Sequence, residues 1–398
     1  MEYALQHQPQ DAEQLIVQRL QMSEALGALA SATQQEAAWL AARVPAPTRA
    51  VMLAGGPLKN VPFMREISAI IGTVDANLFV DFVLGIPMLG WALHAPTQMR
   101  RDREPEETVE DLLARSQAKN LKLISRTRAS GDERLDREAW RKTMEEMEMG
   151  LMSPPVFSLA DLGLSQCCLV RRHGLWEQHG AAVAPTVRVL DDFLEGGQNG
   201  TVGYQYTHRP ANLDTVTATL RTVGERYLEP LEMFTSDFAK AFKQVPGVEA
   251  MLHLSVVVQW DPTSRRPAFL IPYTQVFGGR STPLNFARFP VWCCHAMAVL
   301  AALPCEHCVD DMISAERKRT MRSGWIVWRL FADHCGWRVP DVKSPDPSPQ
   351  CIALGAEFDL VLHPEGPMSV RIHDARIEAI SFILAAIQKD GAVSFLTC

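Results

Sequence analysis

The sequence predicts a mixed α+β fold in which antiparallel β-hairpins alternate with helices. Its 398 residues are 47% hydrophobic and 21% charged, a globular composition that excludes wholesale disorder. From residue 165 onward, short β-rich runs alternate with helical segments, but they do not form a regular βαβ series. The sequence contains no GxGxxG and no P-loop motif, so no dinucleotide site or Walker-type site is predicted. At about 150 residues per domain, the length predicts two to three domains.

The N-terminal third is predicted to be helical. In the first 45 residues, apolar side chains recur at three- and four-residue steps, which is typical of helix. Three prolines and the Gly55-Gly56 pair end this pattern. Residues 97–135 are highly charged, and we expect them to form exposed helix and linker. We therefore assign residues 1–135 to a helical N-terminal extension and linker.

The remaining elements are predicted from local patterns. Residues 136–150 predict a helix that Asp136 caps and Gly150 ends. Strands are predicted where β-rich runs lie between turn residues, and helices where the apolar spacing lengthens. The predicted strands are residues 166–170, 186–190, 253–260 and 267–276, and the predicted helices are residues 213–227, 282–303 and 315–335.

The cysteine content and the N-terminal residues predict an intracellular protein. Nine cysteines are too few for a disulfide-stapled secreted scaffold. The first residues have neither the basic nor the apolar region of a secretory signal peptide, so we expect a cytoplasmic or nuclear location. Residues 77–95 are almost continuously apolar, but Asp81 and Pro87 interrupt them and no basic flank orients them. We expect a buried segment there and no association with a membrane.

Three carboxylates stand out by their context. Asp237 ends an apolar run, and Asp310 and Asp311 are adjacent between apolar or small residues. Neighbouring acids in an apolar strand are costly unless a cation compensates them. Because strand side chains alternate, one of the pair can meet Asp237 on an adjacent strand while the other lies at the turn. Two Mg²⁺ ions about 3.5–4 Å apart are the standard device for in-line phosphoryl chemistry, whereas a lone pair of aspartates is most often a solvated turn.

Further motifs accompany these carboxylates in a fixed order. The segments FTSDFAKAFKQVP, VFGGRSTPLNFAR, CVDD, Gly336 to Lys343 and LGAEF resemble motifs A to E of the reverse transcriptase palm. Upstream, VRVLDDF followed by Asn199 resembles the R-x-x-x-D-[FY] motif of the fingers in the same family. The resemblance covers residues 140–398, and six motifs in the correct order make it specific. The form of motif B is most similar to Gypsy-type and tyrosine-recombinase-type retrotransposons.

The resemblance implies a right-hand polymerase with fingers and an antiparallel palm sheet. It assigns residues 136–228 to the fingers, residues 229–363 to the palm with a fingers segment near 265–285, and residues 364–398 to a partial thumb. In the family a thumb continues further and an RNase H domain follows it. We therefore expect a thumb-truncated piece of a retroelement polyprotein. RNase H and integrase or recombinase activities are expected elsewhere in the parent element.

The resemblance also implies a metal site. Asp237 and Asp310 would be the metal ligands, and Asp311 would be their less essential partner. The backbone carbonyl of Phe238 would complete a metal shell. The implied cofactor is a pair of Mg²⁺ ions, with Mn²⁺ as an alternative. Lys343 matches the motif D lysine proposed to protonate the pyrophosphate leaving group, and its alternative interpretation is a solvated loop lysine.

Two arginines are candidates for contacts with the incoming nucleotide. Arg188 matches the fingers arginine that contacts the triphosphate, and its fork of donors suits phosphate oxygens. Its alternative interpretation is a surface arginine paired with Asp191 or Asp192. Arg172, next to Arg171, is a second candidate phosphate contact, although this hairpin lacks the usual lysine of the family.

An aromatic residue and a glycine-rich loop complete the implied nucleotide site. Phe242 lies five residues after Asp237, where the family places an aromatic steric gate against the ribose 2′-OH. A core aromatic is the alternative interpretation. Gly278 and Gly279 suit a loop whose backbone approaches the templating base pair, because glycine lacks a Cβ. Phe277 stands where many retroviral enzymes have glutamine, as is normal for the retrotransposon branch.

The implied function is RNA-directed DNA polymerase, which adds dNMP to a primer 3′-OH by two-metal catalysis. The implied partners are dNTPs and an RNA or DNA template with its primer. One alternative is a decayed or domesticated copy that binds nucleic acid or protein without catalysis. Cys308 in place of the usual tyrosine, the short thumb, the net charge of −7 and the pI near 5.9 favour this alternative.

Two further alternatives are weaker. An RNA-dependent RNA polymerase would have an aspartate at the position of Phe242, which accepts the 2′-OH. A zinc site is suggested by Cys305-x-x-Cys308, which has zinc-knuckle spacing. No second CxxC or CxxH follows it, and Cys308 lies within the implied catalytic strand.

Overall fold

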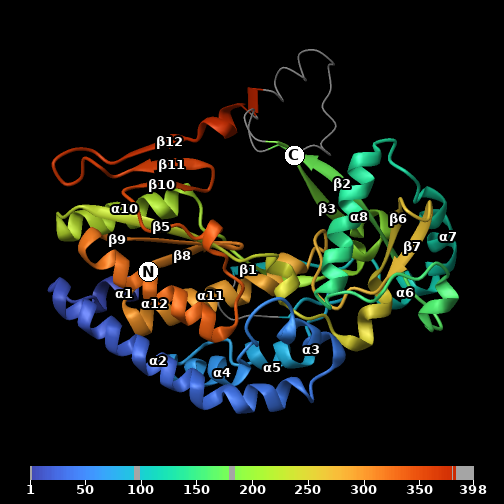
Figure 1. Cartoon of the computed structure of the whole chain (residues 1–398), viewed down its shortest axis with the longest axis horizontal. Helices are drawn as coiled ribbons and strands as arrows, with labels where there is room; N and C mark the ends of the chain where they lie inside the picture. The colour runs from blue at the N-terminus through green and yellow to red at the C-terminus, as the bar shows by residue number, and fades with distance from the viewer. Residues whose placement is uncertain (1, 94–98, 179–183, 379, 382–398) are drawn as a thin grey trace.

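The computed structural model describes residues 2–93, 99–178, 184–378 and 380–381, and it forms two lobes above a helical base (Figure 1). The α-helices are α1 (Glu2–His7), α2 (Ala12–Ala41), α3 (Ala46–Leu53), α4 (Val61–Ile71), α5 (Leu78–Leu84), α6 (Val109–Ala114), α7 (Ser116–Arg126), α8 (Glu133–Glu148), α9 (Phe193–Gly196), α10 (Leu213–Tyr227), α11 (Thr282–Ala301) and α12 (Lys318–Cys335). The strands are β1 (Met99–Arg103), β2 (Leu169–Glu177), β3 (Thr186–Asp192), β4 (Tyr204–Thr207), β5 (Leu231–Asp237), β6 (Val256–Asp261), β7 (Arg266–Leu270), β8 (Cys305–Cys308), β9 (Asp311–Arg317), β10 (Gln350–Ala353), β11 (Ala356–Asp359) and β12 (Ser369–Ile372). Five 3-10 turns are η1 (Leu159–Leu162), η2 (Gln198–Thr201), η3 (Ala241–Gln244), η4 (Glu249–Ser255) and η5 (Asp341–Lys343).

The strands confirm the mixed α+β class. In the described residues they form sheets of order β3-β2-β6-β7, β5-β9-β8, β10-β11-β12 and β1-β4. The pairings are antiparallel except that of β2 with β6, which is parallel. Both predicted hairpins are present, β2 with β3 and β6 with β7. The parallel pair joins these two hairpins into one sheet, which a local hairpin pattern does not predict.

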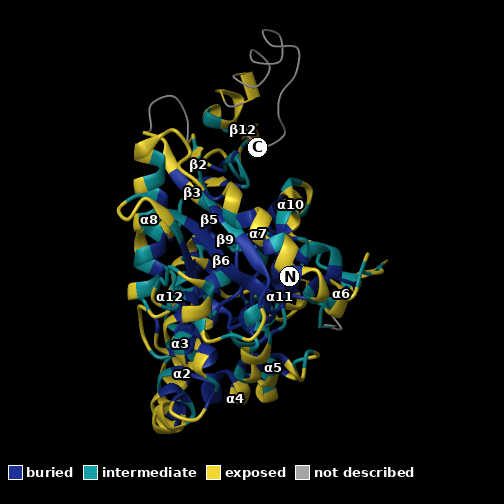
Figure 2. Ribbon diagram, turned by 90° about the vertical axis from the view of Figure 1, so that its right-hand side faces the viewer, coloured by how far each residue is buried: buried dark blue, intermediate teal, exposed yellow. Residues whose placement is uncertain are grey.

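The β5-β9-β8 sheet separates two hydrophobic clusters, because side chains alternate along β5. Met233 packs with α10, β10 and β11 on one face of the sheet. Phe234 packs on the other face with residues of α11 and α12. Ser236, also on that face, accepts a hydrogen bond from the indole of Trp328 at 2.9 Å. The buried strands β5 and β9 run through the middle of the molecule in Figure 2.

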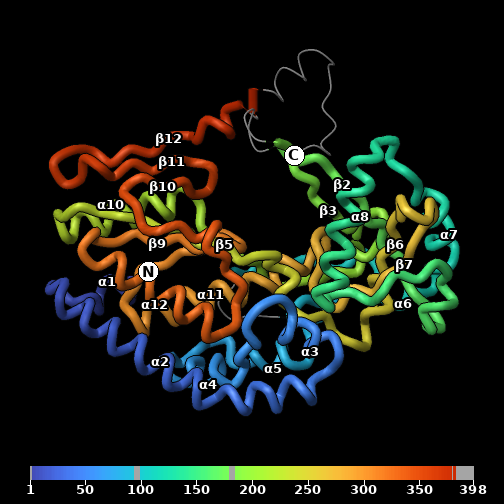
Figure 3. Tube along the Cα trace, viewed as in Figure 1, coloured from blue at the N-terminus to red at the C-terminus, as the bar shows by residue number. Residues whose placement is uncertain are grey.

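The N-terminal helices share the core of this sheet and do not form a separate body. Leu26 of α2 and Phe63 of α4 belong to the same buried cluster as the aromatic residues of α11 and α12. Arg19 of α2 is fully buried and binds Glu316 of β9, with 2.9 Å between Nη2 and Oε2. Figure 3 shows α2 extending along the base of the molecule. The sequence predicted these helices but not the surface that they cover.

The expectation of an exposed helix and linker over residues 97–135 is wrong in part. Strand β1 pairs with β4, and helices α6 and α7 pack beside β2 through the buried Leu112 and Leu123. The amide of Asn120 donates to the Cys167 carbonyl at 2.8 Å and accepts from the Leu169 N–H at 2.9 Å. Isolated leucines among charged residues suffice to bury one face of each helix, because the charged side chains extend outward into solvent.

Two smaller predictions also change. Helix α8 begins at Glu133 with Asp132 as its N-cap, so Asp136 is not the cap, although Gly150 follows the helix as predicted. Within the described residues 77–93 of the apolar stretch, the one helix is the seven-residue α5, whose Leu78 and Phe82 are buried. Among the described residues, α11 alone is long and apolar enough to cross a membrane, and 72% of its apolar stretch lies inside the protein, as in a core helix. Of the expected partial thumb, residues 379 and 382–398 lie outside the described residues.

Candidate active site

The three predicted carboxylates meet at one end of the β5-β9-β8 sheet. Asp237 ends β5 and lies directly opposite Asp311, the first residue of β9. Residues that face each other across antiparallel strands have Cβ atoms about 4.5–5.5 Å apart, so these side chains are neighbours on one face. Asp310 lies in the turn between β8 and β9, where its carbonyl accepts from the Phe238 N–H at 3.2 Å. One aspartate of the pair therefore meets Asp237 from the adjacent strand and the other lies at the turn, as the alternation of strand side chains predicted.

The hairpin turn has two residues, and its backbone is unusual. Val309 adopts a φ of +55°, in the left-handed region that a β-branched residue rarely occupies. Two-residue hairpin turns need such a φ to match the twist of the strands that they join. The turn thereby places Asp310 at the end of the sheet, next to Asp311 of β9.

The carboxylates repel each other and are half-buried. Burial and then the charges of Asp310 and Asp237 raise the pKa of Asp311 to about 6. Burial, followed by the charge of Asp237, also raises the pKa of Asp310. Lys343 of η5 is the cation at the cluster, and its Nζ lies 2.5 Å from Asp237 Oδ2. This hydrogen bond raises the pKa of Lys343, so the lysine stays charged.

The donor set suits a hard cation. Asp237 Oδ1 is buried without a hydrogen-bond partner in the structure, and carboxylate oxygens are the ligands that Mg²⁺ and Mn²⁺ prefer. Within the described ranges, however, no three side chains of His, Cys, Asp or Glu are arranged to hold an ion, at the aspartates or at Cys305 and Cys308. The residue types fit a metal, and Asp237 Oδ1 is without a partner while Oδ2 contacts Lys343.

The loop with Gly278 is held against the β2-β3 hairpin. Gly278 has a φ of +104°, and a Cβ there would lie 2.0 Å from the carbonyl oxygen of Asp191. Only glycine fits this position. Asn199 fastens the loop, since its amide donates to the Gly278 carbonyl at 3.1 Å and accepts from the Arg280 N–H at 2.7 Å. The later asparagine of the predicted fingers motif therefore positions the glycine loop.

Arg188, Phe277 and Phe242 form a chain of contacts between the two lobes. The Arg188 guanidinium lies 4.5 Å from the ring centroid of Phe277 and forms an ion pair of 3.0 Å with Glu177. The side chain of Arg188 is 49% exposed, and its charge acts on Asp310 across the space between the lobes. The Phe277 and Phe242 rings have centroids 5.9 Å apart. The half-buried Phe242 also packs edge-on against Phe286, which anchors it in the core.

Arg172 is buried in a charge cluster that the sequence did not reveal. Its guanidinium binds both oxygens of Asp191, at 2.7 and 3.0 Å, and Glu146 at 3.0 Å. Lys243 forms an ion pair with the same Glu146 oxygen at 3.2 Å. The contact of Arg172 with a nucleotide stays a prediction, and this environment favours a structural role. The sequence does not indicate that Glu146 and Lys243 pair, because one lies in helix α8 and the other near the end of a distant motif.

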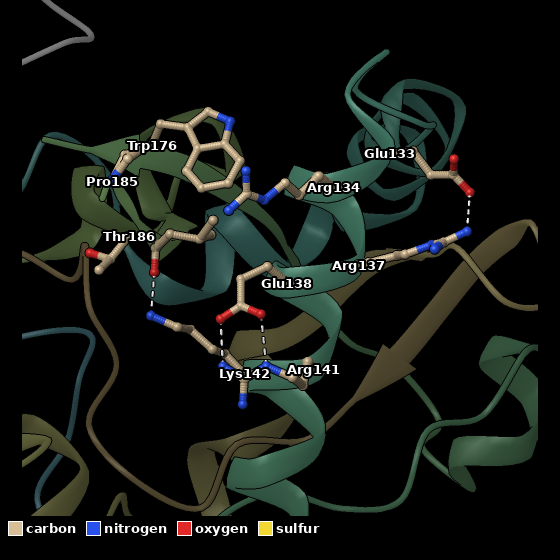
Figure 4. Close-up of a pocket in the computed structure, with 10 residues that line it drawn as sticks. Glu133, Arg134, Arg137, Glu138, Arg141, Lys142, Trp176, Pro185 and Thr186 are labelled. Atoms are coloured by element: carbon tan, nitrogen blue, oxygen red, sulfur yellow. Dashed lines mark hydrogen bonds and ion pairs between the residues drawn. The ribbon is translucent and has the colours of Figure 1, made fainter. Parts of the chain in front are cut away.

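A separate surface cavity of about 710 Å³ lies between α8 and the start of β3 (Figure 4). Trp176 and Arg134 lie at one end of it, with the guanidinium 5.3 Å from the ring centroid. Two ion pairs within α8 lie along it, Arg137 with Glu133 and Arg141 with Glu138. None of the predicted site residues lines this cavity.

Comparison with known proteins gives a distant likeness of fold. No protein-family model matches the sequence, and no curated protein matches it. The chain is similar to a foamy viral protease-reverse transcriptase in complex with double-stranded DNA, with 11% identity and a TM-score of 0.44 over 76% of this chain and 46% of that one. It is also similar to a prototype foamy virus protease-reverse transcriptase mutant, with 14% identity and a TM-score of 0.36 over 52% of this chain and 24% of that one. This chain thus spans less than half of either structure, and so distant a likeness carries no weight for activity, substrate or partner.

Proposed function

We propose that the chain is an RNA-directed DNA polymerase that extends a primer with dNTPs on an RNA or DNA template. The observation that supports this most is the register of β5 and β9, which sets Asp237 opposite Asp311 and puts Asp310 in the adjoining turn. Three acids with one lysine and an unpartnered buried oxygen leave excess negative charge. A cation that binds phosphate would neutralise that charge.

In the proposed reaction, Asp237, Asp310 and Asp311 hold Mg²⁺ or Mn²⁺, and the Phe238 carbonyl is a further candidate ligand. Bound there, the metal would supply charge neutralisation for in-line attack of the primer 3′-OH on the α-phosphate. Lys343 would move from Asp237 to the leaving group. There the charged lysine would donate a proton to the pyrophosphate oxygen that leaves.

The nucleotide would lie between the lobes. Arg188 is half-exposed and bound to one surface carboxylate, so its fork can be exchanged for triphosphate oxygens. Phe242 and Phe277 present aromatic surface between Arg188 and the carboxylates. Phe242 is the proposed gate against a ribose 2′-OH. The origin of the chain in a Gypsy-type or tyrosine-recombinase-type retroelement polyprotein, and its intracellular location, belong to this proposal.

Primer extension on an RNA template, with dNTPs and Mg²⁺, tests the proposal. Asp237→Asn and Asp310→Asn should each lower the rate about 100-fold or more, because several kcal/mol of charge stabilisation are lost. Asp341→Asn is the matched control, since this exposed acid on η5 binds Arg329 and not the cluster. Preference for rNTPs over dNTPs would indicate an RNA polymerase instead.

A second candidate is a nucleic-acid-binding module without catalysis. The contact of Lys343 with Asp237 and the lack of three converging ligands in the described chain favour it. It predicts that the folded parent chain binds primer–template but does not extend it with Mg²⁺ or Mn²⁺. It also predicts that Asp310→Asn leaves the binding unchanged.

A further inference from the structure

Lys59, in the loop between α3 and α4, is a buried lysine with no carboxylate partner among the described residues. Its side chain is removed from solvent, and its Nζ donates to Gln244 Oε1 and to the Gly336 carbonyl, both at 2.9 Å. The Nζ also lies 4.3 Å from the ring centroid of Trp337. A buried lysine is expensive, so its hydrogen bonds must serve a purpose that an apolar residue would not.

Gln244 connects Lys59 to the turn that follows Asp237. Its Oε1 accepts a second hydrogen bond, from the Arg338 N–H at 2.9 Å. Its Nε2 donates to the carbonyls of Ala239 and Arg338, at 3.0 and 3.2 Å. The fully buried Gln244 amide therefore uses both ends to bind the two segments beside the carboxylates.

The turn held by Gln244 carries Phe242. Within it, Lys240 has a φ of +49°, and the Val245 N–H donates to the Phe242 carbonyl at 3.2 Å. The Phe242 ring reaches Phe277 on one side and Phe286 on the other. A change in the hydrogen bonds of Gln244 would therefore move the backbone on which this ring stands.

We propose that Lys59 is a positioning residue that fixes the Phe242 ring through Gln244 and so sets discrimination between deoxyribonucleotides and ribonucleotides. This inference rests on the proposed function, in which Phe242 is the gate. The N-terminal layer, which consists of helices α1 to α5 and the loops between them, then contributes to the selectivity of the site. The reacting groups of that site belong to other segments. The contact needs two N–H donors, which a lysine amine has in its charged and its neutral form.

The loop geometry supports a fixed position for Lys59. The Asn60 N–H donates to the Cys335 carbonyl at 3.2 Å, and the Lys59 N–H donates to the Met52 carbonyl at 3.1 Å. Gly336 has a φ of +76°, and a Cβ there would lie 2.7 Å from the Leu58 carbonyl oxygen. Both ends of the lysine are therefore held, its backbone by α3 and α12 and its amine by Gln244.

Two measurements on Lys59→Met test the inference, with Arg19→Met as the matched control. Arg19 is also a buried basic residue that joins the N-terminal layer to the β5-β9-β8 sheet, but it binds Glu316 and not Gln244. In single-nucleotide incorporation, the dNTP-to-rNTP ratio of kcat/KM should fall about tenfold in Lys59→Met, a loss of about 1.4 kcal/mol of discrimination. Arg19→Met should keep the parent ratio even if it lowers the melting temperature. An unchanged ratio in Lys59→Met overturns the inference.

Hydrogen exchange separates failure of this inference from failure of the proposed function. Amides of residues 239–245 should exchange faster in Lys59→Met than in Arg19→Met, whether or not the chain incorporates nucleotides. If the parent chain incorporates no nucleotide but exchange is faster in Lys59→Met, the proposed function is overturned and the positioning contact stands. Unchanged exchange overturns the positioning contact in any case. If Lys59→Met does not fold, Gln244→Met cuts the same contact from the other side and must give the same two results.

Discussion

Two charge clusters differ in how far their charges cancel. Where β2, β3 and α8 meet η3, Arg172 and Lys243 are matched by Glu146 and Asp191, and all four side chains are buried. At the end of β5 and β9, three half-buried aspartates share one lysine whose side chain is 54% exposed. We call the first cluster closed, because its charges cancel, and the second open, because negative charge is in excess. A closed cluster stabilises the fold, whereas an open cluster is suited to a ligand of opposite charge.

The largest expected effect tests the closed cluster. Arg172→Met leaves Asp191 buried without its bidentate partner and should lower the free energy of unfolding by about 3–5 kcal/mol. Lys343→Met, at the half-exposed lysine of the open cluster, should change it by about 0–1 kcal/mol. Urea denaturation of both variants checks this difference. Equal losses would erase the distinction between the two clusters.

The pH dependence of stability probes the open cluster. The folded-state pKa of Asp311 is about 6, against an ordinary 3.8, so the folded state binds this proton more tightly than the unfolded state does. The contribution of this group to stability is full below pH 3.8 and is lost as the pH rises to about 6. The loss should be about 2–3 kcal/mol in metal-free protein. Asp311→Asn should remove it, as seen in the parent-minus-variant difference in unfolding free energy from pH 4 to 7. The same pH profile in both proteins would contradict the proposed repulsion.

Binding of a divalent ion should offset a loss of that size in the free energy of unfolding. At about 100 times the dissociation constant, Mg²⁺ stabilises a one-site protein by about 2.7 kcal/mol, which thermal unfolding at pH 7.5 detects. Asp237→Asn should abolish the shift, and Asp341→Asn, outside the cluster, should keep it. A shift of equal size in Asp237→Asn would mean that the ion binds elsewhere.

The arrangement of the candidate site residues was more predictable from the sequence than the buried long-range contacts around them. The register that sets Asp237 opposite Asp311 follows from one apolar strand that ends in an acid and a neighbouring strand that begins with one, and the left-handed Gly278 follows from a Gly-Gly pair in a motif. Arg19 and Lys59 could not be predicted in the same way, because their partners lie 297 and 185 residues away. A cation within an apolar helix or loop does not reveal which distant acceptor it binds. The parallel pairing of β2 with β6 was missed for the same reason, since it depends on contacts between hairpins.

The position of the N-terminal helices has a consequence for synthesis of the chain. Helix α2 is made before its partners, because the carbonyls and the carboxylate that satisfy Arg19 follow about 280 to 300 residues later. Until α11, β9 and α12 appear, α2 and α4 have no core to cover, and their apolar faces remain open to other chains. The core around the β5-β9-β8 sheet must then close by non-local contacts, which form slowly. Substitutions in α2 should therefore reduce the yield of folded protein during translation more than they reduce the stability of molecules that have already folded.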